Sequence, residues 1–564
     1  MLSNLIFRII AVFMCFISSF SGLTDATEPQ TKQYELHNGG TTEMENGRVG
    51  IHDPSIIKDG DTYYLFGTHL CAAKSTDLIN WTDVACGVSD DNPLFRQDGK
   101  TLRQILSEPL SWPDAYQTIM NYNESNWETN IWAPQVIYNS YMDKYCYYSC
   151  STVWGTTASV IWFATADNIE GPYTYEKAIV YSGFNNRTLE GKYVRSDSMH
   201  FSFTNMGELM NKGIFSVKEL QNGPWYRWDG SYNSEVYPNC IDPNVFYDED
   251  GQLWMSYGSY FGGIYVMPLC EKTGTPDYDK MKNTPGYDIY FGKKIITTAF
   301  ANDLSGEGPY IQYDPQTDYY YLFVSYGGLN ATGGYNMREY RSKKPDGPYV
   351  DAGYNLASEN ANTGLKLMGS YNLDCLDTAY LAAGHGSVFA ENGKLFNVYH
   401  TRFNSGYENY EVRIHQLMRT KSNWLVMLPF EYKGESINEM GYTLSEIAGE
   451  YEFIAHGNTT FRTDNMADRE NIIAPTQHIT LNENGTITGL QIYHGDKNNT
   501  ALSSKQVSGN WKIKENTPYI TLVIDNVKYE GVLCRQKDES AQEKEVLVFS
   551  AISETNETIW GVHK

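Results

Sequence analysis

Four residues that can move protons or bind a cation stand at the beginnings of short apolar segments in one recurring pattern. They are Asp53, Asp242, Glu307 and His385. Carboxylates and imidazoles act as general acids and bases, and both bind metal ions, provided that the fold brings them together. An Asp followed by proline is also an ordinary turn residue, so a single such position has a structural explanation. Recurrence at the same position of the pattern favours a shared site.

The pattern occurs five times along the chain. Each copy has a small or turn residue, a short apolar strand, a turn rich in Asp, Asn or Gly, and an aromatic strand. Several copies continue into further strands, so that each supplies about four strands, and radial repetition of four-stranded sheets is a β-propeller. The copies are "DPSIIKDGDTYYLFGT" from Asp53, "APQVIYNSYMDKYCYYSCST" from Ala133, "DPNVFYDEDGQLWMSYGSY" from Asp242, "EGPYIQYDPQTDYYYLFVSYGG" from Glu307 and "HGSVFAENGKLFNVYHT" from His385.

The sequence therefore predicts an all-β protein with a five-bladed β-propeller over residues 27–438. Short alternating strands such as "HITLNENGTITGLQIY" predict a smaller antiparallel β-barrel or sandwich over residues 439–564. In a propeller the innermost strand of every blade runs along the central axis. If the first strand of each copy is that innermost strand, the four polar residues converge at one mouth of the central channel.

Residues 1–26 have the composition of an export signal, with one Arg, an apolar stretch and then small residues. No later segment approaches the roughly 20 apolar residues that a membrane-spanning helix needs. We therefore expect a protein that is secreted or exported to the cell envelope. Eight cysteines follow the signal. Some can pair in an oxidising compartment, buried free thiols are the alternative, and the sequence leaves the pairing open.

The charge of the chain limits its partners. The formal net charge is −25 and the isoelectric point is about 4.8, which argues against nucleic acids and anionic membrane surfaces. A neutral partner fits best. Aromatic residues make up 14% of the chain, which suits both β-strands and surfaces that stack on sugar rings. The candidates for stacking are Trp132, Trp154, Tyr260 and Phe261, for which burial in the core is the alternative.

The ordered motifs resemble those of glycoside hydrolase family 43, and within it the two-domain extracellular endo-α-1,5-L-arabinanases. The resemblance covers residues 45–435 and rests on the ordered set, since any one motif alone is a weak signal. The motifs that carry it are "HDPSIIKDGDTYYLFGT", "NIWAPQVIYN", "IDPNVFYDEDG", "SGEGPYI" with "YYYLFVSYGG", and "GHGSVF". It implies a hydrolase that cleaves internal α-1,5-L-arabinofuranosidic bonds of plant cell-wall arabinan or arabino-oligosaccharides.

The resemblance also implies roles for the four polar residues. Asp53 matches the general base, Glu307 the general acid, and Asp242 the carboxylate that orients the acid and raises its pKa. An inverting hydrolase uses a protonated acid at the leaving oxygen and a carboxylate that activates water behind the sugar. His385 matches a histidine associated with one calcium ion, and because calcium prefers oxygen, water would complete the ligand shell.

Two positions depart from the pattern of the resembled family. Gln135 stands where Asp is frequent, at a position that we interpret as structural, so catalysis is not threatened. Gly386 stands where Asn is frequent, which puts the outer shell of the metal in doubt. The same three acids also serve exo-arabinanases, arabinofuranosidases and β-xylosidases, which therefore remain alternatives, since loops at the cleft ends decide between exo and endo action. A non-catalytic glycan-binding propeller has no need of three carboxylates at one mouth. Oligomeric state and the role of the C-terminal domain stay open.

Overall fold

A computed structural model describes most of the chain. The described residues are 47–120, 130–186, 199–298, 306–405, 407–457, 472–495 and 502–564. The predicted export signal lies outside these ranges. Among the described residues, none of the helices combines the length and the apolar character needed to span a bilayer.

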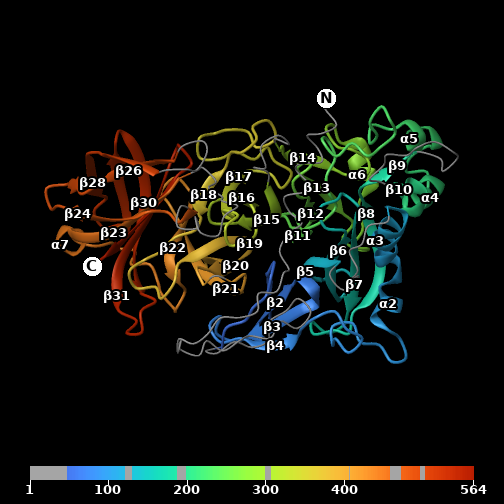
Figure 1. Ribbon diagram of the computed structural model, residues 1–564, viewed down its shortest axis with the longest axis horizontal. Coiled ribbons are helices and arrows are strands. Elements are labelled where there is room, and N and C mark those ends of the chain that lie inside the picture. The colour runs from blue at the N-terminus through green and yellow to red at the C-terminus, as the bar shows by residue number, and fades with distance from the viewer. Residues whose placement is uncertain are drawn as a thin grey trace, which may run out of the picture. The chain divides into compact units, whose positions relative to one another are not determined.

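Five four-stranded antiparallel sheets follow one another along the chain, each with its strands hydrogen-bonded in sequence order (Figure 1). The first three blades consist of β1 (Ser55–Asp59), β2 (Thr62–Gly67), β3 (Cys71–Ser75) and β4 (Thr82–Ala85); β5 (Ile131–Asn139), β6 (Lys144–Thr152), β7 (Ser159–Ala166) and β8 (Thr174–Tyr181); and β11 (Asn244–Tyr247), β12 (Leu253–Tyr257), β13 (Ile264–Leu269) and β14 (Lys293–Ile296). The last two consist of β15 (Gly306–Asp314), β16 (Tyr319–Tyr326), β17 (Asn336–Ser342) and β18 (Leu365–Met368); and β19 (Tyr380–Glu391), β20 (Lys394–Phe403), β21 (Tyr410–Arg419) and β22 (Leu425–Glu431).

The first strands of the blades form the inner ring of the propeller. Contacts run from β1 to β5, from β5 to β11, from β11 to β15, from β15 to β19, and from β19 back to β1. This closed cycle confirms the predicted five-bladed propeller. It also confirms that the apolar strand at the start of each sequence repeat is the innermost strand of its blade.

The ring closes between the first and fifth blades. The backbone N–H of Val412 in β21 donates to the carbonyl of Val49, just ahead of β1, at 3.0 Å. Beside this bond, the Arg48 guanidinium donates to both carboxylate oxygens of Glu431, at 2.9 and 2.6 Å. One apolar cluster also joins the two blades, with Ile51 on one side and Val398 on the other. The closure therefore combines a backbone hydrogen bond, an ion pair and apolar burial.

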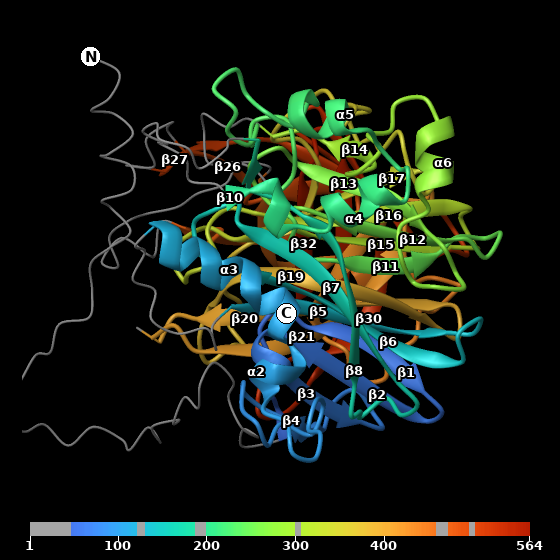
Figure 2. The same cartoon turned by 90° about the vertical axis from the view of Figure 1, so that its right-hand side faces the viewer.

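Long connections between blades carry the helices. In the connection to the second blade, α2 (Leu102–Ile105) precedes α3 (Ser107–Met120), which packs on β6 and β7 (Figure 2). The connection to the third blade holds the short strands β9 (Phe184–Asn185) and β10 (Met199–His200), the 3-10 turn η5 (Phe201–Phe203), and helices α4 (Met206–Asn211) and α5 (Val217–Asn222). Outside these connections, η3 (Thr68–Leu70) joins β2 to β3, α6 (Tyr278–Asn283) lies between β13 and β14, and α7 (Leu444–Ile447) precedes the barrel.

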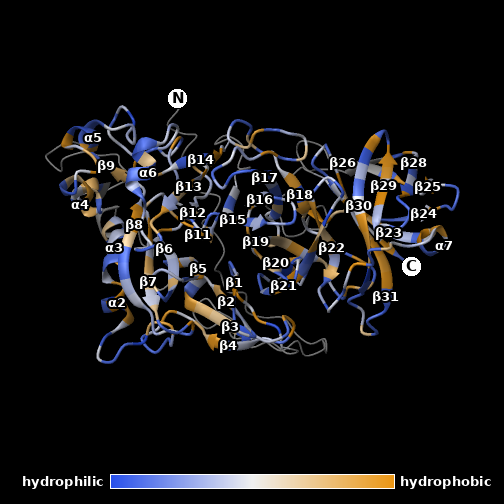
Figure 3. Cartoon of the chain, turned by 180° about the vertical axis from the view of Figure 1, so that it is seen from behind, coloured by the Kyte–Doolittle hydropathy of each residue, from blue (hydrophilic) through white to orange (hydrophobic). Residues whose placement is uncertain are grey.

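The C-terminal strands close into an eight-stranded barrel, which decides between the barrel and the sandwich predicted from the sequence. Alternate residues such as Tyr451 and Phe453 face its core, and the hydrophobic residues concentrate on the strands (Figure 3). The barrel strands, in hydrogen-bonding order, are β23 (Gly449–His456), β24 (Thr476–Leu481), β25 (Thr486–Thr488), β28 (Gly509–Ile513), β29 (Tyr519–Ile524), β30 (Val527–Lys537), β31 (Glu545–Ser553) and β32 (Thr558–His563), beside a hairpin of β26 (Gln491–Gly495) and β27 (Leu502–Gln506).

Replacing Arg48 by Ala tests the closure of the ring. Burial alone would raise the pKa of Glu431, but the Arg413 and Arg48 guanidinium groups hold it below its ordinary value. We expect R48A to lower the free energy of unfolding by about 1.5–3 kcal/mol at pH 7, the usual contribution of hydrogen bonds to a charged group. Because the folded pKa is depressed, the advantage of the wild type is complete above the unfolded pKa and shrinks as pH falls through the folded one.

Urea unfolding of R48A and wild type at several pH values measures this effect. Arg535→Ala is the matched control, because Arg535 forms a more exposed ion pair with Glu446 at 3.3 Å in the barrel. We expect the control to cost at most about 1 kcal/mol. Equal losses in the two variants would contradict a special contribution of Arg48 to ring closure.

Candidate active site

Each innermost strand has a residue in the left-handed backbone conformation, at its entry or at a bulge within it. The φ angles are 53° at Asp53, 39° at Ala133, 57° at Asp242, 58° at Gly308 and 46° at His385. Proline follows the first four of these residues, and glycine follows the fifth. Non-glycine residues rarely adopt this conformation, and a following proline restricts the backbone further. The propeller therefore imposes one unusual turn on every blade, and three of these turns carry a chemically active side chain.

Glu307 does not occupy this repeated position, because Gly308 does. Glu307 pairs with the second strand of its blade just ahead of a bulge, which is the place that Trp132 takes in the second blade. The prediction that all three acids share one repeat position is therefore wrong for Glu307, which stands one residue earlier. Glycine suits position 308, since a Cβ there would lie 2.9 Å from the His385 ring.

The four polar residues nevertheless meet in one cavity of about 390 Å³. Asp53, Asp242 and Glu307 are each at least 91% buried, so their carboxylates have little water around them. The residues lining this cavity are His52, Asp53, Thr68, His69, Trp132, Trp154, Ile241, Asp242, Glu307, Leu329, His385 and Tyr410.

Asp53 is surrounded by hydrogen-bond donors. Its Oδ1 lies 2.8 Å from Nδ1 of His52 and 3.0 Å from Nδ1 of His385, and its Oδ2 accepts a hydrogen bond from the Thr68 hydroxyl. The Thr68 Oγ1 in turn accepts the backbone N–H of Ala133 at 2.9 Å. Burial acts to raise the pKa of Asp53, but His385 and His52 hold that pKa well below its ordinary value. Asp53 is therefore an ionised carboxylate, the state that a general base needs.

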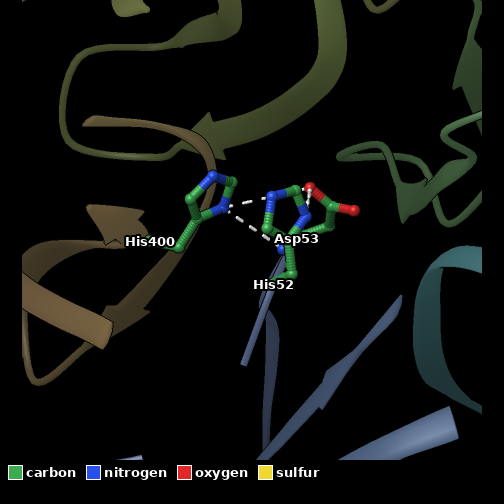
Figure 4. Close-up of side chains that lie close together, drawn as sticks. All are labelled: His52, Asp53 and His400. Carbon is green, nitrogen blue, oxygen red and sulfur yellow. Dashed lines mark hydrogen bonds and ion pairs between the residues drawn. The ribbon is translucent and has the colours of Figure 1, made fainter. Parts of the chain in front are cut away.

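The imidazole of His400 supports the placement of both His52 and Asp53. The rings of His52 and His400 stack with centroids 3.9 Å apart, and the backbone N–H of Asp53 donates to Nδ1 of His400 at 3.3 Å (Figure 4). Arg402 Nη2 lies 3.3 Å from Nε2 of His52. Because a guanidinium can only donate, Nε2 of His52 accepts, and its Nδ1 carries the hydrogen that faces Asp53. His52 is thus fixed in one tautomer and orientation.

Glu307 has the opposite electrostatic environment. Burial and the neighbouring Asp242 carboxylate raise the pKa of Glu307 to about 7. The Tyr335 hydroxyl donates to its Oε1 at 2.7 Å, and the Ser259 hydroxyl donates to its Oε2 at 3.2 Å. These two donors fix both carboxyl oxygens of a group that remains substantially protonated near neutral pH. Glu307 can therefore supply a proton where Asp53 can accept one.

The pKa of Asp242 lies between those of Asp53 and Glu307. Burial, together with the charge of Asp53, raises the pKa of Asp242 to about 6, against the opposing effect of His385. Its Oδ2 accepts the backbone N–H of Gly308 at 3.1 Å, which ties it to the residue after Glu307. Asp242 therefore both raises the pKa of Glu307 and holds the backbone that carries it.

His385 is the cationic partner of the three acids. Burial lowers its pKa, but Asp53, Asp242 and Glu307 together raise it to about 10. Its Nδ1 lies 3.0 Å from Oδ1 of Asp53, so Nε2 is the ring nitrogen that remains for a metal ion. A histidine whose one ring nitrogen is held by a carboxylate commonly ligates a metal through the other. With a pKa of about 10 the ring carries a proton on Nε2 near neutral pH, so a metal ion would have to displace that proton. The negative charge of the three acids around the ring favours a cation in the place of the proton.

A second group that could hold a metal consists of His52, Asp53 and His400, whose ligand atoms lie within 4.8 Å of one another. Its two imidazole nitrogens already serve Asp53, through the carboxylate and through the backbone N–H. Two nitrogen ligands also suit calcium poorly, because calcium prefers oxygen. His385 is therefore the better candidate for the predicted calcium.

The four predicted stacking residues divide into two pairs. Trp132 and Trp154 line the cavity, with their rings edge to face and 5.7 Å apart, and Trp154 is 47% exposed. Tyr260 and Phe261 do not line the cavity that the described residues form. Instead, the Tyr260 hydroxyl donates to the Gly327 carbonyl, and its backbone N–H donates to the carbonyl of Gly306. Tyr260 thus supports the strand that carries Glu307 and does not face this cavity.

Several supporting residues escaped the sequence analysis. His52 directly precedes Asp53 and was visible in the first motif, but its type alone gave no reason to choose it over a turn residue. Thr68 follows β2, 15 residues after Asp53, and Tyr335 precedes β17, 28 residues after Glu307. Strand pairing within the first and fourth blades brings these hydroxyl groups to the carboxylates, so no local motif in the sequence marks them.

Comparisons with known proteins agree with this site. Glycosyl hydrolases family 43 matches residues 189–425, and a C-terminal lipocalin-like domain of that family matches residues 429–561. The chain is 38% identical over 533 residues to an extracellular endo-α-(1→5)-L-arabinanase of Thermotoga petrophila, covering 91% of this chain and 93% of the relative. It is 36% identical to extracellular endo-α-(1→5)-L-arabinanase 2 of Bacillus subtilis, covering 91% and 92%.

A solved structure extends the likeness to the fold. The crystal structure of endo-1,5-α-L-arabinanase from Thermotoga petrophila superposes with a TM-score of 0.70 at 36% identity, covering 92% of this chain and 99% of the other. The propeller and the barrel that follows it are thus shared in outline with that endo-1,5-α-L-arabinanase. The chain belongs to glycosyl hydrolases family 43.

Tyr335→Phe tests how Glu307 is held. The variant removes a donor that lowers the pKa of Glu307. We expect that pKa to rise, and the alkaline limb of the pH–rate profile to move up by as much as about one pH unit, the equivalent of 1.4 kcal/mol. We also expect kcat to fall several-fold, because one carboxyl oxygen is no longer oriented.

The control is Tyr326→Phe, which removes a buried hydroxyl from the same blade, where it contacts Tyr340 at 2.8 Å. This variant should leave the alkaline limb in place. A Tyr335→Phe profile that is merely lower, with its limb unmoved, would show that Tyr335 contributes only to packing.

Proposed function

We propose that this protein is an extracellular endo-α-1,5-L-arabinanase. The observation that carries the proposal is the pair of carboxyl groups with opposed pKa values in one cavity, Asp53 ionised and Glu307 raised to about 7. Two relatives that share more than 90% of their length with this chain are named extracellular endo-α-(1→5)-L-arabinanases, which supports the substrate and the endo mode. The export signal proposed for residues 1–26 agrees with that location.

The chemistry follows from the protonation states. Glu307, held by Tyr335 and Ser259, donates its proton to the oxygen of the leaving arabinofuranosyl unit. Asp53, fixed by two imidazoles and the Thr68 hydroxyl, takes a proton from the water that attacks the anomeric carbon. Attack from the face opposite the leaving group inverts the anomeric configuration. Asp242 keeps Glu307 protonated until substrate binds, since a second negative charge nearby opposes ionisation.

The aromatic residues of the cavity supply a surface for the polymer. Trp132 and Trp154 present two indole rings beside the acids, and Trp154 is the more exposed of the two. Sugar rings pack their apolar faces against such side chains. We propose that these two residues bind arabinofuranosyl units on either side of the cleaved bond.

We also propose one calcium ion bound through Nε2 of His385, with water and nearby oxygens as its other ligands. The support is the imidazole held by Asp53 and the three carboxylates around it. A bound divalent cation would neutralise part of this negative charge and lower the pKa values of the neighbouring acids.

Product analysis on debranched arabinan tests the activity. We expect wild-type enzyme to release a ladder of arabino-oligosaccharides, and early NMR spectra to show inverted anomers. Release of arabinose or of one short oligomer alone would favour the exo-acting alternatives, and retained anomers would exclude the water-mediated displacement. The variants Asp53→Asn and Glu307→Gln should each lose about 10²–10⁴-fold in kcat.

Asp167→Asn is the matched control for these two variants, because it removes a surface carboxylate that is 86% exposed and pairs with Lys144. Its activity should equal that of wild type. Circular dichroism verifies that all three variants fold. Activity within tenfold of wild type in Asp53→Asn or Glu307→Gln would contradict the role assigned to that residue.

Chelation and calcium replacement test the metal. Wild-type enzyme freed of metal by a chelator should lose activity, and calcium should restore activity and raise Tm, because a ligand that binds only the folded state stabilises it. His385→Gln should show no rise in Tm with calcium, whereas His478→Gln, an exposed change on the barrel, should respond like wild type. If neither chelation nor added calcium changes the Tm or the activity of the wild type, the calcium proposal is wrong, and His385 acts only as the cationic partner of the acids.

A further inference from the structure

Two cysteines of the first blade lie against each other. Sγ of Cys71 is 4.0 Å from Sγ of Cys86. Cys71 begins β3, and Cys86 directly follows β4. Ala72 pairs with Ala85 across these antiparallel strands, so the register continues to Cys71 opposite Cys86. Directly opposed residues of antiparallel strands have Cα atoms about 4.5–5.5 Å apart, which lies within the range that a disulfide spans.

A buried amide holds both backbone segments in this position. Nδ2 of Asn92 donates to the carbonyl of Leu70 at 3.0 Å and to the carbonyl of Gly87 at 2.7 Å. Leu70 precedes Cys71, and Gly87 follows Cys86. Asn92 is 2% exposed, so both bonds are protected from water. The strand ends that carry the two thiols are thus fixed independently of any bond between the sulfur atoms.

The other cysteines have no comparable arrangement. Eight cysteines are described, and among them only Cys71 and Cys86 have sulfur atoms in contact with each other. Cys146 and Cys150 lie on the same strand, β6, so they cannot face each other across two neighbouring strands. The structure therefore singles out Cys71 and Cys86 as the pair that can form a disulfide, a pairing that the sequence left open.

We propose that Cys71 and Cys86 form a disulfide bond in the exported protein. Both thiols lose their hydrogens as the Sγ–Sγ bond forms, and a low-molecular-weight disulfide is reduced to two thiols. Cys86, which is partly exposed, attacks the external disulfide as a thiolate and releases the first thiol. Cys71 then attacks the Cys86 sulfur of the mixed disulfide and releases the second.

The hydrogen bond between the thiols favours this order of events. Donation by Cys71 lowers the pKa of Cys86, whereas the pKa of Cys71 is raised well above its ordinary value by that bond and by burial. The partly exposed thiol is thus also the one that ionises more readily. The buried thiol lies directly behind it, ready to displace the leaving group.

The bond would anchor a strained loop of the active site. His69 and Leu70, directly before Cys71, have φ angles of 62° and 58°. Thr68, directly before them, donates its hydroxyl to Asp53. Fixing Cys71 covalently to β4 therefore restrains the C-terminal end of the loop that holds Asp53. This bond closes a covalent loop of about 15 residues, a length for which disulfides give appreciable stabilisation.

Peptide mapping of the full-length protein tests the bond directly. The protein is first reduced, then incubated with excess oxidised glutathione, alkylated and digested without reductant. We expect one cross-linked species that joins the Cys71 peptide to the Cys86 peptide, about 2 Da lighter than the sum of the two because two hydrogens are lost. Glutathione attached to Cys86 with Cys71 still alkylated would overturn the proposal, as would two free thiols.

Thermal unfolding tests the effect on the loop. The oxidised wild type should have a Tm several degrees above that of the reduced wild type, and it should keep its activity longer at elevated temperature. Cys86→Ser should abolish the difference between oxidising and reducing conditions, and its partly exposed position makes it the safer of the two substitutions for folding. Cys270→Ser, a control at another partly buried cysteine, should keep the difference.

The mapping does not depend on the enzymatic activity, so it can succeed even if the proposed substrate is wrong. If the cross-link is demonstrated but the oxidised and reduced wild type have equal Tm values, the proposal that the disulfide restrains the loop is wrong.

Discussion

The site depends on the placement of three carboxylates in a cavity that leaves each at most 9% exposed. Burying an ionised carboxylate without partners is costly, so each must either gain donors or remain protonated. Asp53 takes the first course, with two imidazoles and a hydroxyl around it. Glu307 takes the second, under the influence of Asp242. The same fold therefore produces a base and an acid from one residue class, because the surroundings of the two groups differ.

This division explains why so many polar groups lie behind the acids. His52 orients one hydrogen toward Asp53 only because Arg402 occupies its other nitrogen. Arg402 is paired in turn with Glu408 at 3.0 Å, and Glu408 accepts the backbone N–H of Ala331. The charge of Arg402 is thereby compensated by that of Glu408. A substitution of Glu408 or Arg402, away from the acids themselves, would therefore change the orientation of His52 and with it the hydrogen bonding of Asp53.

The sequence predicted the blades well because repetition can be read locally. The Gly60-Asp61 turn joins β1 and β2 as its hairpin chemistry indicates, and Asp53 and Asp242 share the left-handed turn of the repeat. Glu307 was placed one residue off, because the bulge that shifts it forms only when β15 pairs with β16. Tyr260 was expected to face a sugar, but its hydroxyl instead reaches the Gly327 carbonyl. Bulges and contacts between blades depend on tertiary pairing, which local patterns do not contain.

The closure between the first and last blades also has a consequence for biosynthesis. Asp53 touches His400, which lies 347 residues further along the chain, and the Arg48–Glu431 pair spans 383 residues. Such distant contacts form late, since a long stretch of chain must be ordered before they can be made. The nascent polypeptide thus has no working proton donor and acceptor pair while it is being made. His385 belongs to the fifth blade, so a chain truncated before that blade lacks the imidazole that holds the pKa of Asp53 low, however well its first four blades fold.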